Sequence, residues 1–365
     1  MRIAVACGGT GGHIFPGLAT ANELKRRGHE VTLWMAGKDV ENEAVKGWDG
    51  PVVTIMAKGL PSKVRFQSAL AGLQLLKAIG KVKAQMKVNR PDVVLAMGSY
   101  ASVGPVGAAL RLGIPCVLHE SNVIPGRAIR LLSRWSAVVA GCFDETRFYL
   151  RRRNLVITGM PLRADLLEAA RTPRADAGGT PFRLLVMGGS RGAHRINELV
   201  SEALVRLKSE GQTVEVAHLT GEQDQAFIER RYREHGIAAT VMAFTREMGA
   251  HYRNADFAVC RAGAATCAEL FAFGLPALLI PYPHAIHDHQ TANARAMEKM
   301  GAADMVPEND VTTDWLVSYL GRMMRDRERR GRMSEAAKAQ FSGDGAVKLA
   351  DVVERVAADG AYVPA

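Results

Sequence analysis

Short runs of apolar, often β-branched residues alternate along the chain with longer stretches whose apolar residues recur at helical spacing. Such runs predict the buried strands of a parallel sheet, and the stretches between them predict crossover helices. In the first half the predicted strands are 2–7, 30–35, 52–56, 92–97, 115–119, 137–140 and 155–158. The pattern restarts at 182–187 and continues through 213–219, 239–242, 257–260 and 277–280. This alternation predicts two doubly wound α/β domains of similar architecture.

The boundary between the domains is expected at Gly159-Met160-Pro161, where turn formers interrupt the pattern. A length of 365 residues also suits two domains, each with its own core. We expect the first domain to span 1–162 and the second 163–344. The piece 171–181, rich in Pro and Gly, is expected to be a surface loop of the second domain. Periodicity does not say which domain the last helical stretch, 345–358, packs against.

Cysteine use and hydropathy bear on the compartment. The five cysteines are scattered and form no C-x-x-C pair, which argues against a disulfide framework or a zinc ribbon and favours a reducing compartment. The apolar run at the N-terminus is too short for the core of a signal peptide. No stretch approaches the roughly 20 apolar residues of a spanning helix. We expect a cytosolic protein whose membrane contact, if any, is peripheral.

The net charge of +10 is unevenly distributed. Residues 1–160 hold 22 Lys and Arg against 10 Asp and Glu, whereas residues 161–365 hold 25 against 27. The basic first half suggests that this domain faces something anionic, and a merely solvated basic surface is the alternative.

The helical stretch 66–87 carries two apolar stripes. Leu75, Ile79, Val82 and Met86 recur at spacings of 4, 3 and 4 and are expected to face the core. A second stripe, in line with two lysines, would suit an anionic bilayer surface if it is exposed. The second stripe and its lysines are Phe66, Leu70, Leu73, Lys77 and Lys81. Burial of both stripes is the alternative.

A glycine-rich segment, 7–13 (Cys-Gly-Gly-Thr-Gly-Gly-His), joins the first predicted strand to a helix. Such glycines let backbone N–H groups close on an anion, and the helix N-terminus adds a favourable partial charge. The pattern G-x-G-x-x-G is incomplete because Ile14 stands where the third glycine belongs, which disfavours a nicotinamide enzyme. The second domain opens alike, with Gly-Gly-Ser-Arg-Gly at 188–192. If the carboxyl edges of the domains faced each other, one turn would hold a diphosphate and the other an acceptor; plain tight turns are the alternative.

A third strand, small-residue turn and helix occupy 260–269. Small residues permit close approach of a ligand, Thr266 offers phosphate a hydroxyl and an N–H group, and Glu269 suits the two hydroxyls of a ribose. The alternative role for this acid is interaction with the helix dipole.

Metal chemistry is disfavoured. The chain contains no Asp-x-Asp pair, the metal-bridging motif of many nucleotide-sugar enzymes. The leaving diphosphate would then be stabilised by loop N–H groups, helix dipoles and basic side chains such as Arg163. His284, His287 and His289 match no standard metal-site spacing. We expect neither a metal nor a cofactor.

His13 directly follows the first glycine turn. There the helix dipole would lower the pKa of the imidazole and keep it neutral, as a general base for a sugar hydroxyl requires. Orientation of the loop or phosphate binding is the alternative. The segment His-Glu-Ser-Asn at 119–122 supplies Glu120 and Asn122 as further catalytic candidates, while a buried structural role is as plausible for His119.

Six segments together resemble the MurG family, bacterial glycosyltransferases of peptidoglycan precursor synthesis. They are 8–17, 119–122, 159–163, 188–193, 261–269 and 274–276, in order over nearly the whole chain. The resemblance implies a GT-B fold, in which two Rossmann-like, doubly wound parallel-sheet domains face a cleft. The first domain would bind the acceptor and the membrane, with the final helix packed back on it. The second would bind UDP-GlcNAc.

The resemblance also implies the reaction. GlcNAc would pass with inversion from UDP-GlcNAc to the C4 hydroxyl of MurNAc in undecaprenyl-diphosphoryl-MurNAc-pentapeptide, which converts lipid I into lipid II. The enzyme would be metal-independent and peripheral at the cytoplasmic face of the bacterial inner membrane, serving cell-wall synthesis, cell shape and division. Its partners would be UDP-GlcNAc, lipid I and an anionic membrane surface, without nucleic acid. A single in-line displacement needs one base and one clamp for UDP, so we expect no covalent intermediate.

The resemblance also implies which residues bind the substrates, motif by motif. Those implied on the sugar side of the cleft are Thr10, Gly11, Gly12 and Asn122. Arg163 and Ser190 would meet the donor diphosphate, and Thr245 the uracil. Those implied at the diphosphate and ribose are Ala264, Ala265, Thr266, Cys267, Ala268 and Glu269. Gln290 would reach the donor sugar.

The chain departs from the family pattern at three positions. Ser121 replaces an expected Gln, His289 stands where a Gln usually precedes Gln290, and Met160 replaces a more polar residue. These differences weaken the assignment of donor-sugar selectivity most.

Three other functions stay open. A glycolipid transferase of the same superfamily would act on a diacylglycerol acceptor, and a UDP-GlcNAc epimerase would share the donor site without needing a lipid surface. A nucleic-acid-binding protein would explain the basic half but not the glycine turns, and no recognised nucleic-acid motif occurs.

Overall fold

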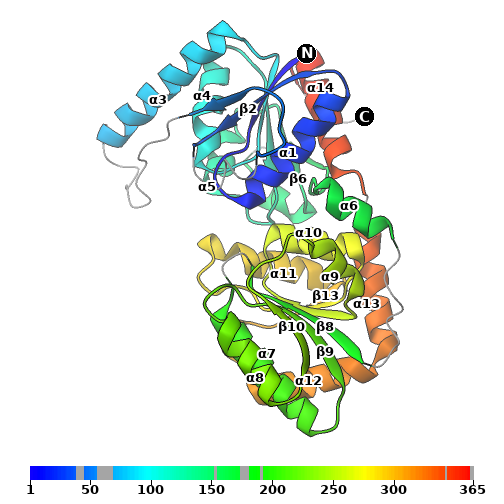
Figure 1. Cartoon of the computed structure of the whole chain (residues 1–365). Helices are drawn as coiled ribbons and strands as arrows, with labels where there is room; N and C mark the ends of the chain where they lie inside the picture. Colours follow the sequence, from blue (N-terminus) through cyan, green and yellow to red (C-terminus); the bar gives the residue numbers. More distant parts are fainter. Residues whose placement is uncertain are drawn as a thin grey trace. The chain divides into compact units, whose positions relative to one another are not determined.

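The computed structural model describes residues 1–37, 45–55, 69–151, 154–172, 181–189, 192–341 and 343–361, with side chains of the helix at 69–88 described from Leu76 onward. The chain divides into two compact units (Figure 1). The first contains Met1–Arg163 together with Asp344–Ala365, and the second contains Ala164–Gly343. Arg163, expected to open the second domain, therefore belongs to the first unit.

A seven-stranded sheet forms the centre of the first unit, in the order β3-β2-β1-β4-β5-β6-β7. Its described strands pair in parallel throughout. The strands are β1 (Arg2–Ala6), β2 (Glu30–Met35), β3 (Val52–Thr54), β4 (Val93–Ala96), β5 (Cys116–Glu120), β6 (Val138–Gly141) and β7 (Leu155–Ile157). All seven correspond to strands predicted from the hydrophobic pattern, with ends shifted by up to two residues.

Helices cover both faces of this sheet, because successive side chains of a strand point to opposite faces. Ile3 and Val5 pack into one core with the helices α1 and α14, whereas Ala4 and Ala6 pack into another with α3 and α4. The helical elements of the unit are α1 (Gly11–Arg26), α3 (Ala69–Val88), η1 (Tyr100–Ser102), α4 (Val103–Arg111), α5 (Arg127–Leu132), η2 (Asp144–Tyr149) and α14 (Gly345–Asp359).

Helix α3 confirms part of the predicted stripes. Ile79, Val82 and Met86 are buried in the core, while Lys77 and Lys81 are exposed. Phe66 lies outside the described residues, as do the side chains of Leu70, Leu73 and Leu75. Among the helices that the structure describes, none is both long and apolar enough to cross a bilayer.

The second unit is built around a six-stranded sheet in the order β10-β9-β8-β11-β12-β13, again parallel between the described neighbours. Its strands are β8 (Phe182–Met187), β9 (Val214–Leu219), β10 (Ala238–Met242), β11 (Phe257–Cys260), β12 (Ala277–Leu279) and β13 (Ala303–Met305). The pattern did not predict β13, because this short edge strand has Asp304 at its centre and no β-branched residue.

The helices of the second unit surround this sheet, and one core cluster joins β8 and β11 to α7 and α12. The helical elements are α6 (Ala164–Arg171), α7 (His194–Ser209), α8 (Gln225–Glu234), α9 (Met248–Asn254), α10 (Ala264–Phe273), η3 (Ile286–Asp288), α11 (His289–Lys299), η4 (Glu308–Asp310), α12 (Thr313–Arg325) and α13 (Arg327–Ala339).

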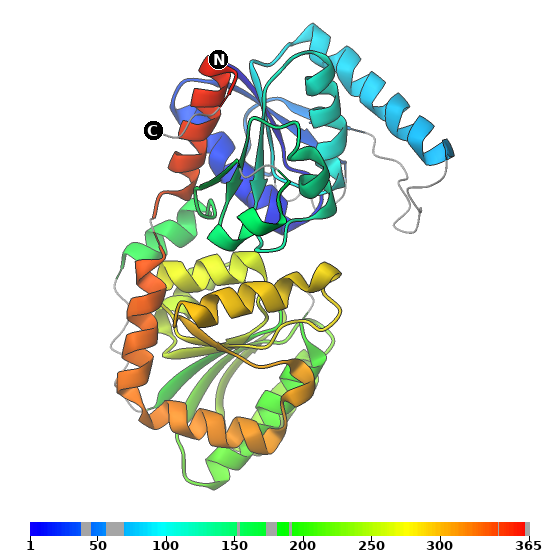
Figure 2. The same cartoon turned by 180° about the vertical axis from the view of Figure 1, so that it is seen from behind.

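The C-terminal helix α14 completes the first unit, beside α1 in both views (Figures 1 and 2). Its apolar residues Leu349, Val352, Val353 and Val356 recur at helical spacing and are buried against the sheet and α1. Full burial of such a side chain contributes about 1.5–3 kcal/mol. Gly360 then ends the helix in the left-handed conformation, at φ +69°.

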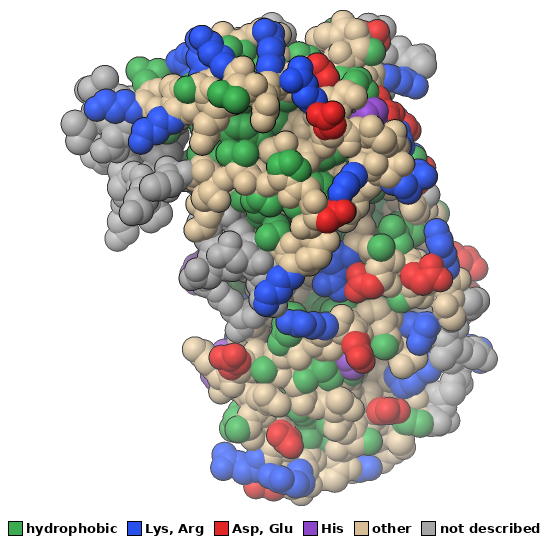
Figure 3. Space-filling model, turned by 45° about the horizontal axis from the view of Figure 1, so that its top comes forward, with side chains coloured by type: hydrophobic (Ala, Val, Ile, Leu, Met, Phe, Trp, Pro, Cys, Tyr) green, Lys and Arg blue, Asp and Glu red, His purple; other side chains and the backbone are tan. Residues whose placement is uncertain are grey.

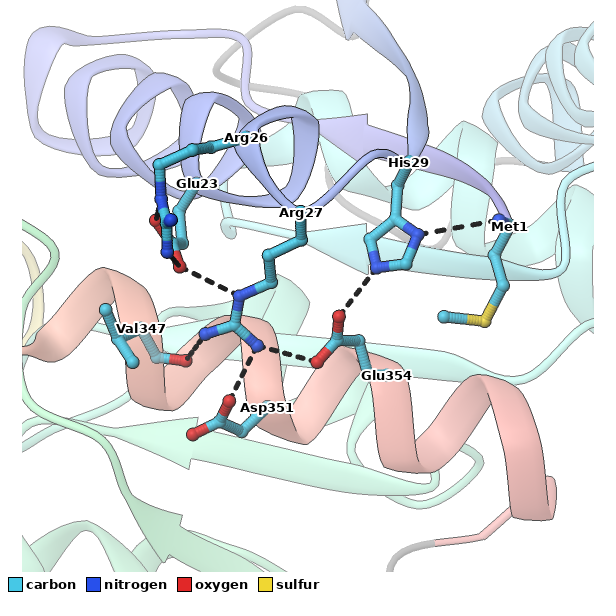
Figure 4. A network of polar contacts seen from close by, with 8 residues as sticks. All are labelled: Met1, Glu23, Arg26, Arg27, His29, Val347, Asp351 and Glu354. Carbon is cyan, nitrogen blue, oxygen red and sulfur yellow. Dashed lines mark hydrogen bonds and ion pairs between the residues drawn. The ribbon is translucent and has the colours of Figure 1, made fainter.

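An ion-pair network ties α14 to the end of α1 (Figure 4). Arg27 Nη1 donates to Asp351 Oδ1 and Glu354 Oε2, each at 2.6 Å, and its Nη2 donates to the carbonyl of Val347 at 3.1 Å. The other carboxylate oxygen of Glu354 lies 2.6 Å from His29 Nε2. Residues more than 300 positions apart in sequence are thereby joined.

We predict that Arg27→Ala lowers the free energy of unfolding of the first unit by about 2 kcal/mol, because Asp351 and Glu354 lose a charged partner in a partly buried setting. Urea denaturation measures the change. Arg26→Ala is the matched control, since this exposed arginine pairs with Glu23 of its own helix and that carboxylate keeps Arg27 as a partner, so the midpoint should stay unchanged. Equal losses in the two variants would contradict this account of the network.

Candidate active site

The strand order of each sheet reverses once, and the reversal marks a candidate ligand site. In the first unit the chain leaves β1 toward β2 on one side and returns to β4 on the other; in the second it does the same at β8, β9 and β11. In open α/β sheets, the loops after the two adjacent strands at such a reversal diverge, and ligands bind in the crevice between these loops. The strands are β1 and β4 in the first sheet and β8 and β11 in the second. Both glycine turns predicted from the sequence lie at these positions.

The first turn joins β1 to α1. Gly9 adopts φ +123°, a conformation that favours glycine, and Thr10 is the N-cap residue of α1. The backbone N–H groups of His13 and Ile14 donate to the carbonyl of Thr10 at 2.9 and 3.0 Å. Thr10, Gly11, Gly12 and His13 thus form the cap and first turn of a helix that begins at the sheet edge.

His13 is half-buried in this turn, with its Nδ1 atom 3.0 Å from the hydroxyl of Thr10. Burial lowers the pKa of His13, so the neutral imidazole is favoured at neutral pH. The ring lies against Gly98, the residue that follows β4 and its flanking Met97: a Cβ atom there would lie 3.2 Å from Cδ2 and 3.4 Å from Nε2 of His13. Gly98 therefore leaves room for the imidazole.

Ser99 fastens the two loops at this reversal point together. Its hydroxyl donates to the carbonyl of Gly8 at 2.7 Å and accepts from the N–H of Ala101 at 3.2 Å. Its backbone, at φ +61° and ψ 173°, lies in a region that essentially glycine alone adopts without strain. Gly98 and Ser99 were not predicted from the sequence, although a Gly-Ser pair directly after a buried strand was a usable signal.

Glu120, a catalytic candidate from the sequence, organises the loop after β5. Its Oε1 accepts from the backbone N–H of Asn122 at 2.9 Å and from Nδ2 of Asn122 at 3.1 Å, and its Oε2 accepts from the N–H of Gly126 at 2.8 Å. Burial raises the pKa of Glu120, and these hydrogen bonds act in the opposite direction. Both carboxylate oxygens of Glu120 therefore hold the loop that carries Asn122, an arrangement that fits a positioning role, while its predicted catalytic role stays a prediction.

His119 is fully buried beside this loop. Its Nε2 lies 3.4 Å from the carbonyl of Gly159 and 3.8 Å from Sγ of Cys142, and its Nδ1 has no hydrogen-bond partner among the described residues. Burial lowers the pKa of His119 to about 4. A neutral imidazole that joins the ends of β5, β6 and β7 fits the structural role that the sequence left open.

Arg163 lies in the first unit, with its guanidinium 5.5 Å from the ring centre of Phe15, which lies two residues after the glycine segment. This is a cation–π contact, and Phe15 is itself partly exposed. The described contacts therefore associate Arg163 with the start of α1.

In the second unit the turn after β8 admits only glycine at two positions. A Cβ atom on Gly188 would lie 2.3 Å from the backbone nitrogen of Ala193, and one on Gly192 would lie 2.0 Å from the carbonyl oxygen of Thr220. Gly192 also has φ +75°. Close approach of backbone explains the glycines. Ser190, expected at the diphosphate, lies outside the described residues.

Helix α10 begins beside this turn, on the other side of the reversal point. Its small first residues, Ala264, Ala265 and Thr266, are partly exposed, and backbone N–H groups in a first turn lack acceptors within the helix. Cys267 is buried, and Ala268 is partly exposed. The arrangement suits an anion at the helix N-terminus.

Glu269, in the second turn of α10, is held by a buried tyrosine. The hydroxyl of Tyr252 donates to Glu269 Oε2 at 2.6 Å. Burial and the neighbouring carboxylate raise the pKa of Tyr252 well above its ordinary value, so the hydroxyl remains a donor. Glu269 is partly exposed. Tyr252, on α9, was not identified from the sequence.

Two more predicted residues follow β10 and β12, two strands that other strands of the same sheet separate. Thr245 follows β10 and accepts from the N–H of Glu247 at 3.0 Å, which fixes the approach to α9, while Phe244 beside it is exposed. Gln290, in the first turn of α11, accepts from the N–H of Tyr282 through Oε1 at 3.0 Å. Just before α11, His287 and Asp288 adopt positive φ angles of +57° and +55°.

Arg261 is a buried cation that maintains this edge. Its Nη1 donates to the carbonyls of Ile280 and Pro281 at 3.2 and 3.1 Å, and its Nη2 pairs with Glu308 at 2.5 Å. These partners show that Arg261 holds the loop after β12. Within the described ranges, no three His, Cys, Asp or Glu side chains gather closely enough to hold a metal ion.

Comparison with known proteins agrees with this geometry. The glycosyltransferase family 28 N-terminal domain matches residues 3–140, and the family 28 C-terminal domain matches residues 183–349. The chain is 36% identical over 354 residues to the UDP-N-acetylglucosamine–N-acetylmuramyl-(pentapeptide) pyrophosphoryl-undecaprenol N-acetylglucosamine transferase of Geobacter metallireducens, covering 96% of this chain and 97% of that protein. With the transferase of the same name from Shewanella baltica it shares 38% identity over 361 residues, covering 98% and 96%.

A solved structure gives the same assignment. The crystal structure of MurG from Acinetobacter baumannii matches with a TM-score of 0.81 and 28% identity, over 97% of this chain and 99% of that chain. The chain belongs to the MurG family of glycosyltransferases. The two parallel-sheet units are accordingly the two halves of a GT-B fold, as the resemblance implied.

The predicted site residues of this family member fall into two groups. Thr10 to His13 and Asn122 lie at the carboxyl edge of the first sheet, and the α10 residues, Thr245 and Gln290 lie at the carboxyl edge of the second. Arg163 belongs to the first group. The residues missed from the sequence act by supporting these groups, through backbone shape at Gly98 or through side-chain contact at Tyr252.

We predict that Gly192→Ala removes measurable UDP-GlcNAc binding and lowers the urea midpoint, because the added methyl group overlaps the carbonyl oxygen of Thr220. Gly211→Ala is the matched control: Gly211 also has positive φ, at +80°, but its added methyl group would meet no atom within 4 Å. It should cost about 1 kcal/mol of stability and leave binding unchanged. Titration calorimetry and urea denaturation measure both effects, and retention of binding in Gly192→Ala would contradict the fit of the turn.

We predict that Glu120→Gln lowers kcat by roughly tenfold. The amide NH2 group would face a backbone N–H group that now donates to the carboxylate, and losing this hydrogen bond would destabilise the ordered loop by about 1–3 kcal/mol. Glu30→Gln replaces an exposed carboxylate of the same unit and should leave kcat unchanged. Steady-state transfer rates decide the matter, and full activity of Glu120→Gln would show that the loop does not need its carboxylate.

Proposed function

We propose that this chain transfers GlcNAc from UDP-GlcNAc to the C4 hydroxyl of MurNAc in undecaprenyl-diphosphoryl-MurNAc-pentapeptide, with inversion at the anomeric carbon. The observation that carries the proposal is the duplicated reversal-point turn, one beside a half-buried histidine and the other beside a carboxylate held by a buried tyrosine. The names of the relatives that match over nearly their full length give the same donor and the same acceptor.

The second unit binds the donor in this proposal. The diphosphate accepts from backbone N–H groups of the Gly188–Gly192 turn and of the first turn of α10, where the helix dipole stabilises the charge that develops on UDP. Glu269, oriented by Tyr252, accepts from the ribose hydroxyls. Thr245 lies at the uracil, and Gln290 reaches the donor sugar. Ser190 adds a contact to the diphosphate.

The first unit supplies the base. When the neutral His13 donates its Nδ1 proton to the hydroxyl of Thr10, the lone pair of Nε2 is free to accept the proton of the acceptor's C4 hydroxyl. The C4 oxygen then bonds to the anomeric carbon while the bond from that carbon to UDP breaks, and UDP leaves with the electron pair. Asn122 positions the acceptor sugar, and Arg163 adds positive charge for the diphosphate.

The reaction needs no divalent cation in this proposal. The chain has no Asp-x-Asp pair to bridge a metal to a diphosphate. Helix N-termini and loop N–H groups supply the electrophilic assistance instead. Transfer therefore proceeds in the presence of EDTA.

The enzyme acts as a peripheral protein at the cytoplasmic face of the inner membrane, because its acceptor is anchored there. The exposed lysines of α3, Lys77, Lys81 and Lys87, support contact with an anionic surface, as do the exposed side chains of Leu76 and Val88. Lys and Arg side chains gather along the upper edge of the first unit (Figure 3).

Two other enzyme functions share the donor chemistry. A related glycolipid transferase would use a diacylglycerol acceptor, and a UDP-GlcNAc epimerase would need no acceptor. Neither has the support that identity over nearly the full length gives to the peptidoglycan reaction.

The pH dependence of His13 follows from its burial. Its pKa lies below the ordinary value of about 6.5, so we predict that the acid limb of kcat/KM has its midpoint below pH 6.5. Because unfolded His13 binds a proton more readily than folded His13, this residue also makes stability fall as the pH drops below 6.5.

His13→Ala should lower kcat by at least a hundredfold. His235→Ala, at an exposed histidine, is the control and should leave both kcat and the midpoint of the acid limb unchanged. An unchanged kcat in His13→Ala would exclude His13 as the base.

The direct test follows radiolabelled GlcNAc from UDP-GlcNAc into lipid I in EDTA and determines the anomeric configuration of the product. We expect transfer with inversion. Bound UDP-GlcNAc without transfer to lipid I would overturn the acceptor assignment, and conversion of UDP-GlcNAc alone would identify an epimerase.

A further inference from the structure

A groove lined by arginines lies in the first unit, outside the glycine turns. Its lining residues are Arg127, Arg130, Leu131, Arg134, Tyr149 and Arg151, around a volume of about 250 Å³. They come from α5, from the end of η2 and from the residues that follow each. No acidic side chain stands among the described residues that line it.

One of these arginines is pre-positioned. The guanidinium of Arg134 stacks over the ring of Trp135 at 4.6 Å, and its Nε atom is buried without a hydrogen-bond partner among the described residues. An arginine fixed by an aromatic ring loses little further conformational freedom when it binds an anion. The geometry therefore favours a bound anion over a merely solvated basic surface.

Large apolar side chains are exposed beside the arginines. Leu131 is 36% exposed, Tyr149 40%, Trp135 51% and Phe148 74%. Aromatic side chains beside arginines suit a ligand that is charged at one end and apolar at the other, as at the surface of a bilayer.

The groove adjoins the loop that carries Asn122. Helix α5 begins directly after Gly126, whose N–H donates to Glu120 and whose carbonyl accepts from the N–H of Arg130 at 2.9 Å. From η2, the hydroxyl of Thr146 donates to the carbonyl of Asn122 at 3.1 Å. Both walls of the groove are therefore tied to the loop where the acceptor sugar is expected.

We propose that this arginine groove binds the diphosphate that joins the acceptor's sugar to its lipid chain. The inference rests on the proposed function and adds a subsite to it. Such a diphosphate keeps a negative charge on each phosphate, and guanidinium groups bind phosphate oxygens in pairs. The first units of the lipid chain then lie on the exposed apolar side chains, which orients the sugar toward Asn122.

The test uses Arg130→Gln, Arg151→Gln and the double variant, because both arginines are exposed and their loss should leave folding intact. Arg111→Gln, at an exposed arginine on α4, is the matched control. Each full-length protein is assayed in detergent with lipid I, and also with the methyl glycoside of MurNAc-pentapeptide, which has no phosphate. Flotation with phosphatidylglycerol vesicles lacking lipid I measures binding to bulk headgroups.

We expect each single variant to raise KM for lipid I roughly tenfold and the double variant to raise it further. KM for UDP-GlcNAc, KM for the methyl glycoside and vesicle flotation should match the wild type, as should every value for Arg111→Gln. Equal increases for both acceptors, or no increase, would overturn the subsite. Loss of flotation with an unchanged KM for lipid I would assign the groove to bulk headgroups instead. Absence of transfer to lipid I by the wild-type protein would be a failure of the proposed function itself.

Discussion

A parallel sheet that grows from its first strand in both directions must open at one place. Crossover connections of a single hand carry the chain first to one side of β1 or β8 and later to the other side. In each sheet, the loops after the two adjacent strands at this point, β1 and β4 or β8 and β11, therefore diverge at the carboxyl edge. Backbone N–H groups and helix N-termini lie at this edge, and they provide positive partial charge without the need for a charged side chain. Much of the site depends on this opening: Gly188 and Gly192 let backbone segments pack closely there, while Ser99 holds the loop at Gly8 and Tyr252 holds the carboxylate of Glu269.

In the proposed function, the two openings serve opposite halves of a group transfer. At the first, burial keeps the imidazole of His13 neutral, Thr10 orients it, and Gly98 leaves it room. At the second, small residues begin α10, and Tyr252 holds Glu269 by a short hydrogen bond. A neutral base suits the attack of a hydroxyl, and a helix N-terminus suits the departure of a diphosphate. Similar architecture thus supports two different chemical tasks.

The sequence allowed the prediction of local features and not of their support. Buried strands and glycine turns carry their signal within a few residues, which is why β1, β8 and the turns after them were identified, whereas the polar edge strand β13 was not. The contacts of Ser99 with Gly8 and of Tyr252 with Glu269 join separate strands or helices, and no local pattern specifies them. The hydrogen bonds of Glu120 to the loop at Asn122 and Gly126 show the same limit, since its position at a strand end did not specify them.

Hydrogen–deuterium exchange of the full chain, with and without UDP-GlcNAc, tests most directly whether the two openings divide the reaction in this way. The account predicts slower exchange on donor binding in peptides covering 185–193 and 262–270, with 8–15 unchanged. Protection of 8–15 by the donor, with the second unit unaffected, would contradict it.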